Sequence, residues 1–201
     1  MKLYFAPGAC SLSPHIALHE AGLAHEAEKV DLRAKTTASG ADFLAVNPKG
    51  QVPAFVLDDG TVLTEGPAIV QYIADQAPKS GLAPANGTVE RYKLQEWLSF
   101  VSTELHKSFS PLFKPTTPDA YKPVMRETIE ARLAYVDREL AGRDYLTGSK
   151  FTVADGYLFV ICRWADGMKI DISALKNLVA WKARVFARPG VQAALKHEGL
   201  I

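Results

Sequence analysis

A stretch rich in proline and glycine divides this chain into two parts with different patterns. Residues 78–88, PKSGLAPANGT, contain two prolines, two glycines and no hydrophobic period, which is typical of a linker. Before this stretch, short strand-like segments alternate with helical ones, and after it every segment has helical spacing. We therefore expect an α+β protein of two domains, with residues 1–78 and 88–201 joined by a linker at 79–87.

The first part predicts a small layered domain of mixed strands and helices. The expected segments are a strand at 2–5, a helix at 11–21, a strand at 26–32, irregular helix to about residue 46, a hairpin at 54–63 and a helix from Pro67. The hairpin is indicated by Asp59-Gly60, a dipeptide that favours tight turns. A strand–helix–strand unit followed by a hairpin and a helix predicts an α/β layer.

The second part predicts helices only, at 88–113, 118–141, 153–166, 177–187 and 190–197. Residues 153–166 are apolar on almost every side, as expected for a buried central helix. Thr152 and Asp155 have the spacing of a capping box at the start of that helix. We expect the pair to be structural, and removing the Asp155 carboxylate to cost about 1 kcal/mol or more.

Charge and composition exclude several classes of partner. The 201 residues include 23 basic and 22 acidic ones, for a net charge of +1, so no overall field attracts nucleic acid or an anionic membrane. No stretch has the roughly 18 apolar residues needed to span a bilayer. The first residues, MKLYFAPGA, contain no signal-peptide core, and a cytoplasmic protein is the simplest expectation.

Cys10 lies in the turn between the first strand and the first helix. If that helix begins near residue 11, its unpaired N–H groups stabilise a thiolate and lower its pKa. A buried, unreactive cysteine is the alternative, since free cysteines often pack as small hydrophobes. The second cysteine, Cys162, is 152 positions away, and the pair has no disulfide or zinc spacing. Both interpretations of Cys10 remain open at this point.

Three further motifs have two interpretations each. Glu65 and Gly66 open the helix in TEGPA, where they would hold an amino-acid zwitterion or simply complement the helix dipole. The bond between Val52 and Pro53 could be cis, because it opens a strand beside a thiol site, but the general base rate favours trans. His15 and His19 are spaced i, i+4 and would suit a metal, but the sequence offers no obvious third ligand. We therefore predict no metal.

Taken together, the segments resemble the cytosolic glutathione transferases, and in particular the bacterial beta class. The similarity covers the whole chain. In the first part it rests on MKLYFAPGACSLSPHIALHE, NPKGQVPAF and LTEGPAIVQYIAD, and in the second on ELHKSFSPLF, FTVADGYLFV and ARPGVQAALKHEGLI.

The resemblance implies a thioredoxin-like βαβαββα domain, an all-helical domain, a homodimer and a cis bond before Pro53. It implies glutathione as the co-substrate. The catalytic residues that it implies are Cys10, Ser11 and His106. The residues implied to bind glutathione are Cys10, Lys35, Val52, Pro53, Glu65, Gly66, Thr103, Glu104 and His106. Those implied at the second-substrate site are Lys107, Phe109 and Trp164.

The implied reaction is transfer of glutathione to an electrophilic carbon, as in aryl or alkyl halides and activated alkenes. A Cys10-dependent thiol–disulfide exchange or peroxidase activity would accompany it. The thiolate would be stabilised by Cys10 or Ser11 at the helix start, or by His106. The alternatives are a non-catalytic binder of hydrophobic compounds or antibiotics, and a glutathione-dependent dehalogenase of an aromatic catabolite.

Overall fold

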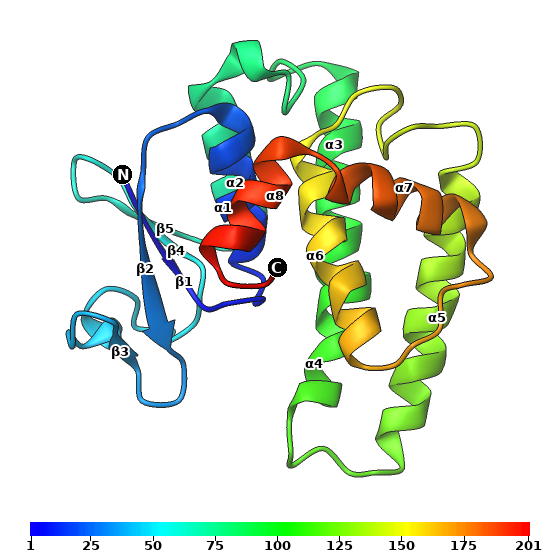
Figure 1. Cartoon of the computed structure of the whole chain (residues 1–201), viewed down its shortest axis with the longest axis horizontal. Helices are drawn as coiled ribbons and strands as arrows, with labels where there is room; N and C mark the ends of the chain where they lie inside the picture. The colour runs from blue at the N-terminus through cyan, green and yellow to red at the C-terminus, as the bar shows by residue number, and fades with distance from the viewer. The chain divides into compact units, whose positions relative to one another are not determined.

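The chain folds into two compact units that do not coincide with a simple cut at the linker. The computed structural model describes residues 1–201 and groups Met1–Ala83 with Arg188–Ile201 in unit 1, and Pro84–Ala187 in unit 2 (Figure 1). We expected all of residues 88–201 to belong to the helical domain, but residues 188–201 belong to unit 1. None of the helices combines the length and the apolar character that crossing a bilayer requires.

Unit 1 is built on one mixed sheet of five strands in the order β3-β2-β1-β4-β5. The strands are β1 (Lys2–Phe5), β2 (Glu26–Asp31), β3 (Thr36–Thr37), β4 (Ala54–Val56) and β5 (Val62–Thr64). The β1–β2 pair is parallel and the other three pairs are antiparallel. The helix between β1 and β2 supplies the crossover that a parallel pair needs.

The expected helix between residue 33 and about residue 46 is wrong. The chain makes a turn instead, followed by β3 and one 3₁₀ turn, η1 (Phe43–Ala45). The Asp31 carboxylate accepts hydrogen bonds from the backbone N–H groups of Arg33 and Ala34, and Lys35 has a φ of 58°. That left-handed conformation cannot continue a helix. Local polar contacts thus override a helix-like composition.

Three helices belong to unit 1: α1 (Leu12–Ala21), α2 (Gly66–Gln76) and, after the whole of unit 2, α8 (Pro189–His197). A short 3₁₀ turn, η2 (Pro78–Ser80), follows α2. α1 packs against both α2 and α8, and Figure 1 shows α8 beside α1. α1 ends where predicted, with Gly22 in the left-handed conformation at φ 66°, which glycine adopts without steric cost.

Unit 2 is entirely helical. Its elements are α3 (Val89–Phe100), the π-helical segment η3 (Val101–His106), α4 (Lys107–Phe113), α5 (Tyr121–Glu139), α6 (Val153–Gly167) and α7 (Lys176–Phe186). α6 is buried over most of its length, as its composition predicts. The predicted fold class, a thioredoxin-like domain with a helical domain, is confirmed.

Asp155 anchors the start of α6 with more contacts than a capping box alone provides. One carboxylate oxygen accepts hydrogen bonds from the N–H and Oγ1 of Thr152, both at 2.9 Å. The other accepts from the N–H of Leu146 and from Nε1 of Trp181, also at 2.9 Å. Burial raises the pKa of Asp155, and these hydrogen bonds oppose that rise. The predicted capping box is present, and it also ties α6 to α7.

Candidate functional site

The Cys10 thiol is half-buried and lies two residues before α1, in unit 1. Its Sγ donates to the main-chain oxygen of Val52 at 3.3 Å. The backbone N–H of Ser13 donates a hydrogen bond to the main-chain oxygen of Cys10, which connects the turn to the first residues of α1. The thiol therefore sits at the positive end of α1 and touches a segment that is 42 residues away along the chain.

Ser11 does not suit the catalytic role that the resemblance implied. Its side chain is fully buried, and its Oγ accepts from the N–H of Ala6 and donates to the oxygen of Ala6. A hydroxyl committed to two backbone groups inside the fold has no remaining geometry for a thiolate outside it. Ser11 instead holds the end of β1 against the start of α1.

The segment before β4 brings main-chain groups next to Cys10. The Val52–Pro53 bond is cis, as the resemblance implied. The Val52 side chain packs in a cluster with Ala6, Val30, Phe43 and Ala54, which holds its backbone in place.

Lys35 lies beside the same segment. Its Nζ donates to the oxygen of Gly50 at 2.7 Å, two residues before Val52. The side chain therefore supports the segment that precedes the cis bond, and its ammonium group stays near that main chain.

Glu65 and Gly66 stand at the start of α2, as predicted. Glu65 has a φ of 68°, an uncommon conformation for a residue with a side chain and one often found at functional sites. The Glu65 carboxylate is well exposed and pairs with Lys49 Nζ at 2.6 Å. Sequence reasoning missed Lys49, although it lies in the quoted segment NPKGQVPAF. A ligand ammonium at Glu65 would have to share this carboxylate with Lys49.

Thr103 and Glu104 have partners within unit 2. Thr103 Oγ1 donates to the oxygen of Ser99 at 3.0 Å. Glu104 Oε2 accepts from Arg132 Nε at 2.9 Å, which connects η3 to α5. Both lie in the π-helical segment, a distortion that often occurs at functional sites.

His106 ends the same π-helical segment, and its Nδ1 lies 2.5 Å from the hydroxyl of Tyr157 on α6. Its ring also meets that of Trp164 edge-on, with 4.9 Å between centroids. Tyr157 was not among the predicted residues, and nothing in the spacing of the sequence pairs it with His106. The two contacts orient the imidazole from two sides.

The residues predicted for the second-substrate site differ in how exposed their side chains are. Phe109 is fully buried, so its side chain is not accessible to a ligand in this structure. Trp164 is half-buried, and it packs edge-on against Phe113 with 5.2 Å between centroids. Phe113 is 46% exposed and was missed. Lys107 is exposed. Trp164 and Phe113 thus offer an apolar surface that suits an aromatic compound.

Glu198, also missed, connects the end of the chain to the Cys10 turn. Its buried carboxylate accepts from the N–H of Gly8 at 2.8 Å and lies 2.9 Å from His15 Nδ1. Gly8 has a φ of 72°, which suits glycine. Because Gly8 is two residues before Cys10, the carboxylate positions the turn that carries the thiol.

Comparisons with known proteins agree with this arrangement. Residues 8–76 match the model of the glutathione S-transferase N-terminal domain, and residues 100–189 match that of the C-terminal domain. Glutathione S-transferase GstA of Escherichia coli O157:H7 is 50% identical over 201 residues, which cover all of both chains.

Solved structures give the same result. A ternary complex of BphK, a bacterial glutathione S-transferase, has a TM-score of 0.98 at 57% identity, covering all of both chains. A beta-class glutathione S-transferase of Sphingomonas chungbukensis has a TM-score of 0.97 at 51% identity, again over both full chains. With identity at this level over its full length, the chain is a glutathione transferase that belongs to the glutathione S-transferase family, in its bacterial beta class.

Proposed function

We propose that this enzyme has two activities that differ in their need for Cys10. One transfers glutathione to an electrophilic carbon, and the other is thiol–disulfide exchange, with peroxide reduction as a side activity. The supporting observation is the 3.3 Å contact between Cys10 Sγ and the oxygen of Val52. It puts a thiol beside main chain with which an extended peptide such as glutathione would pair as an added strand.

In the transfer reaction, the glutathione thiol releases its proton to water and the thiolate sulfur attacks the carbon. A carbon–sulfur bond forms, and the carbon–halogen bond breaks with its electron pair leaving on the halide. With an activated alkene the electron pair moves to the neighbouring carbon, which is then protonated. The protein contributes by positioning the thiolate and stabilising its charge, and Cys10 takes part in no bond change.

In the exchange reaction, Cys10 is itself the nucleophile. Its thiolate attacks the glutathione sulfur of a mixed disulfide between glutathione and another thiol, so that a bond from Cys10 to glutathione forms and the other thiolate leaves. A second glutathione then attacks the glutathione sulfur bound to Cys10, which restores the Cys10 thiol and releases glutathione disulfide. Glutathione bound covalently to Cys10 has no thiolate to attack a carbon, so the two reactions need different states of this residue.

Replacing Cys10 with alanine separates the activities. We expect exchange with 2-hydroxyethyl disulfide to fall by about 100-fold or more, and conjugation of 1-chloro-2,4-dinitrobenzene to stay within about 10-fold. Cys162→Ala is the matched control, because that thiol is fully buried on α6, and both activities should persist in it. Equal loss of both activities in Cys10→Ala would refute the division.

Binding and halide-release measurements distinguish the two alternative functions. A binder of hydrophobic compounds or antibiotics would bind glutathione, measured by calorimetry, without turning over any halide. A dehalogenase of an aromatic catabolite would release halide from chlorinated aromatic acids or phenols faster than from the general substrate.

We assign glutathione to Cys10, Val52, Pro53, Lys35 and the Glu65-Gly66 pair in unit 1. The family resemblance adds Thr103, Glu104 and His106. The exposed Glu65 carboxylate supports the first set, because it suits the ammonium end of the γ-glutamyl group. Glu65→Gln should raise the KM for glutathione several-fold with little change in kcat. An unchanged KM would remove Glu65 from the site.

We also infer a cytoplasmic homodimer. Val89 and Tyr92, one turn apart on α3, are 72% and 62% exposed, and large apolar side chains at this exposure favour an interface. Cytosol would keep both thiols reduced. Sedimentation at micromolar concentration should give twice the chain's mass, and Tyr92→Glu should lower it, whereas a monomer in the unmodified chain would contradict the inference.

A further inference from the structure

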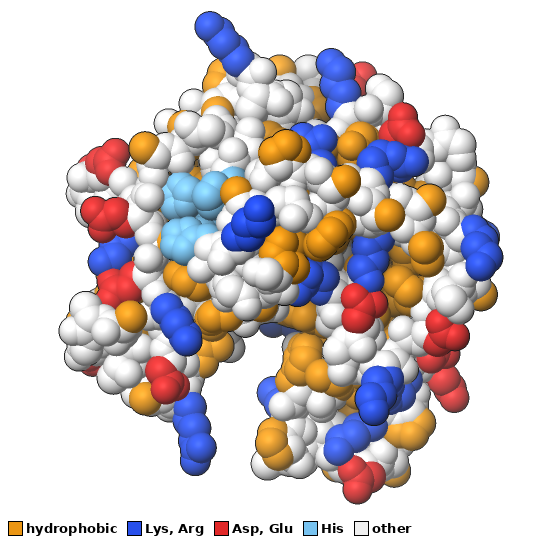
Figure 2. All heavy atoms as spheres, in the orientation of Figure 1, with side chains coloured by type: hydrophobic (Ala, Val, Ile, Leu, Met, Phe, Trp, Pro, Cys, Tyr) orange, Lys and Arg blue, Asp and Glu red, His pale blue; other side chains and the backbone are white.

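Four of the five histidines of this chain gather in one place in unit 1. His15 and His19 lie one turn apart on α1, His197 ends α8, and His25 precedes β2. Figure 2 shows histidine side chains forming a patch at the surface. The cluster contains none of the residues assigned above to glutathione or to the electrophile.

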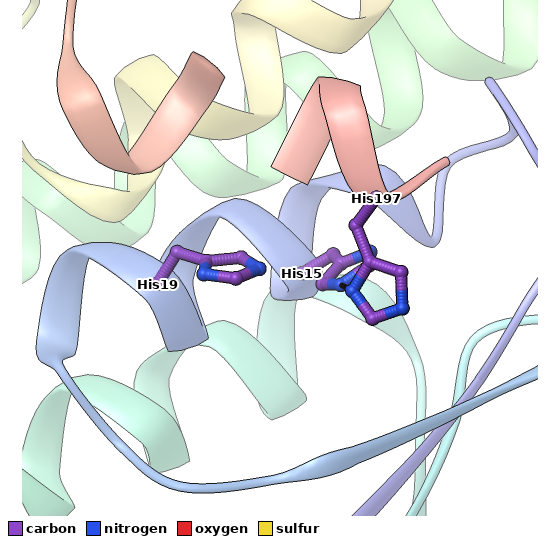
Figure 3. Close-up of side chains that lie close together, drawn as sticks. All are labelled: His15, His19 and His197. Carbon is purple, nitrogen blue, oxygen red and sulfur yellow. Dashed lines mark hydrogen bonds between the residues drawn. The ribbon is translucent and has the colours of Figure 1, made fainter. Parts of the chain in front are cut away.

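Three of these imidazoles are close enough to share one ion. A ring nitrogen of each of His15, His19 and His197 lies within 4.8 Å of the other two, and Figure 3 shows the rings turned toward one another. His15 Nε2 and His197 Nδ1 are 3.2 Å apart. Two nitrogens bound tetrahedrally to zinc at about 2.0–2.1 Å are separated by about 3.3 Å. The His15–His197 pair already has this spacing, and a side-chain movement would bring His19 to it.

His19 supplies an independent reason to expect a ligand. Its Nε2 is buried and has no hydrogen-bond partner within the chain. A buried polar nitrogen without a partner costs free energy, and buried polar groups in native proteins nearly always have a partner. A metal ion between the three rings would satisfy this nitrogen.

Glu198 gives His15 the second contact that metal-bound histidines usually have. The carboxylate lies 2.9 Å from His15 Nδ1, and both side chains are completely buried. When Nδ1 donates its proton to Glu198, Nε2 carries the lone pair and faces His197. A carboxylate that orients a histidine in this way also makes it a stronger ligand.

Solvent reaches the cluster from one side. His197 is exposed, so an ion has a route to the buried rings from solvent.

We propose that His15, His19 and His197 form a site for a divalent transition metal, with Zn²⁺ as an ion that three imidazoles suit and a fourth position open to water. The ion would join α1 to α8 and so connect the end of the chain to the helix that follows Cys10. Its role is then structural, because the electrophile chemistry proposed above requires no metal.

The test is a calorimetric titration of the untagged, chelator-treated enzyme with ZnCl₂ at pH 7. We expect one Zn²⁺ per chain, a rise in the thermal unfolding temperature, and X-ray absorption with nitrogen ligands at about 2.0 Å. His19→Gln and His197→Gln should each weaken binding by at least about 10-fold and abolish the rise in unfolding temperature. His15 is left intact because its loss would remove one of the two contacts of the buried Glu198 carboxylate.

Two controls locate the ion. His106→Gln removes the one histidine outside the cluster and should leave zinc binding unchanged. Cys10→Ala should also leave it unchanged, and so exclude the thiol as the ligand. The proposal fails if zinc does not bind at about 100 µM, if it binds equally to His19→Gln and His197→Gln, or if Cys10→Ala abolishes binding.

Discussion

At the scale of single residues, the two cysteines differ in burial, and burial affects how readily a thiol ionises. Cys10 is half-buried at the start of α1, where the helix favours its anion. Cys162 is completely buried in α6, and burial raises the pKa of its thiol to about 12. We therefore expect the thiol of Cys10 to be reactive and that of Cys162 to be inert.

Alkylation should distinguish the two thiols. Iodoacetamide at pH 8 should add one adduct to the native enzyme, at Cys10, and two after unfolding in guanidinium chloride. The reason is that only the thiolate reacts and Cys162 stays protonated at that pH. Peptide mapping by mass spectrometry identifies the sites, and modification of Cys162 in the native enzyme at the rate of Cys10 would contradict the assignment.

At the scale of elements, two carboxylates with several hydrogen-bond or ion-pair partners connect neighbouring helices and strands. Asp155 joins the start of α6 to Leu146 and to Trp181 of α7. Glu28 on β2 binds Lys2 of β1 at 2.5 Å and the hydroxyl of Ser39 at 2.6 Å. Each carboxylate therefore fixes two or more segments, which makes its loss more costly than the loss of a single contact.

Asp155→Ala should lower the free energy of unfolding by about 3 kcal/mol or more, because it leaves several buried donors without an acceptor. The sequence alone predicts a loss of about 1 kcal/mol or more, from the value of an isolated cap. Asp166→Ala, on the same helix, is the control, because its carboxylate is exposed and its pair is worth about 1 kcal/mol at most. Urea unfolding measures both, and equal losses would contradict the prediction.

Acid should destabilise the enzyme partly through Glu28. Hydrogen bonds from Lys2 and Ser39 lower its pKa from 4.5 to about 2. Its contribution to stability is therefore complete above about pH 4.5, where the unfolded-state carboxyl is ionised, and is lost as the pH falls toward 2. The urea midpoint should fall less steeply between pH 5 and 3 in Glu28→Gln than in the unmodified enzyme, and identical slopes would exclude this group.

At the scale of the whole molecule, the chain leaves unit 1 after Ala83 and returns to it at Arg188. The returning segment buries Val191, Ala194 and Leu195 completely and brings in Glu198, which bonds to Gly8. Unit 1 is therefore completed by residues that the chain supplies only at its end.

Ending the chain at Ala187 should unfold unit 1. Burial of Val191 and Leu195 contributes about 1.5–3 kcal/mol each, against a total stability of about 5–15 kcal/mol for a domain. Limited proteolysis should then cut within residues 1–83 first. Ending the chain at Leu200 is the matched control, since it removes only the exposed Ile201. Equal protease resistance of the Ala187 and Leu200 forms would contradict this role of α8.

Sequence patterns alone predicted what depends on neighbours along the chain. The Thr152–Asp155 box, the Asp59-Gly60 turn, the Gly22 helix end and the position of Cys10 before α1 all follow from spacings of a few residues. The helix expected before residue 46 failed because the Asp31 carboxylate bonds to the next two N–H groups and Lys35 is left-handed. Composition does not report such contacts.

Only the tertiary structure decided the contacts between distant segments. It pairs Lys49 with Glu65 and His106 with Tyr157, and it commits Ser11 to Ala6. Above all, it brings His197 next to His15 and His19. In the sequence, these two histidines had the spacing of metal ligands but no evident third ligand. The physical reason is that α8 packs on α1 through buried apolar surface. Whether two apolar surfaces bury each other depends on how well their shapes fit, and not on their separation along the chain.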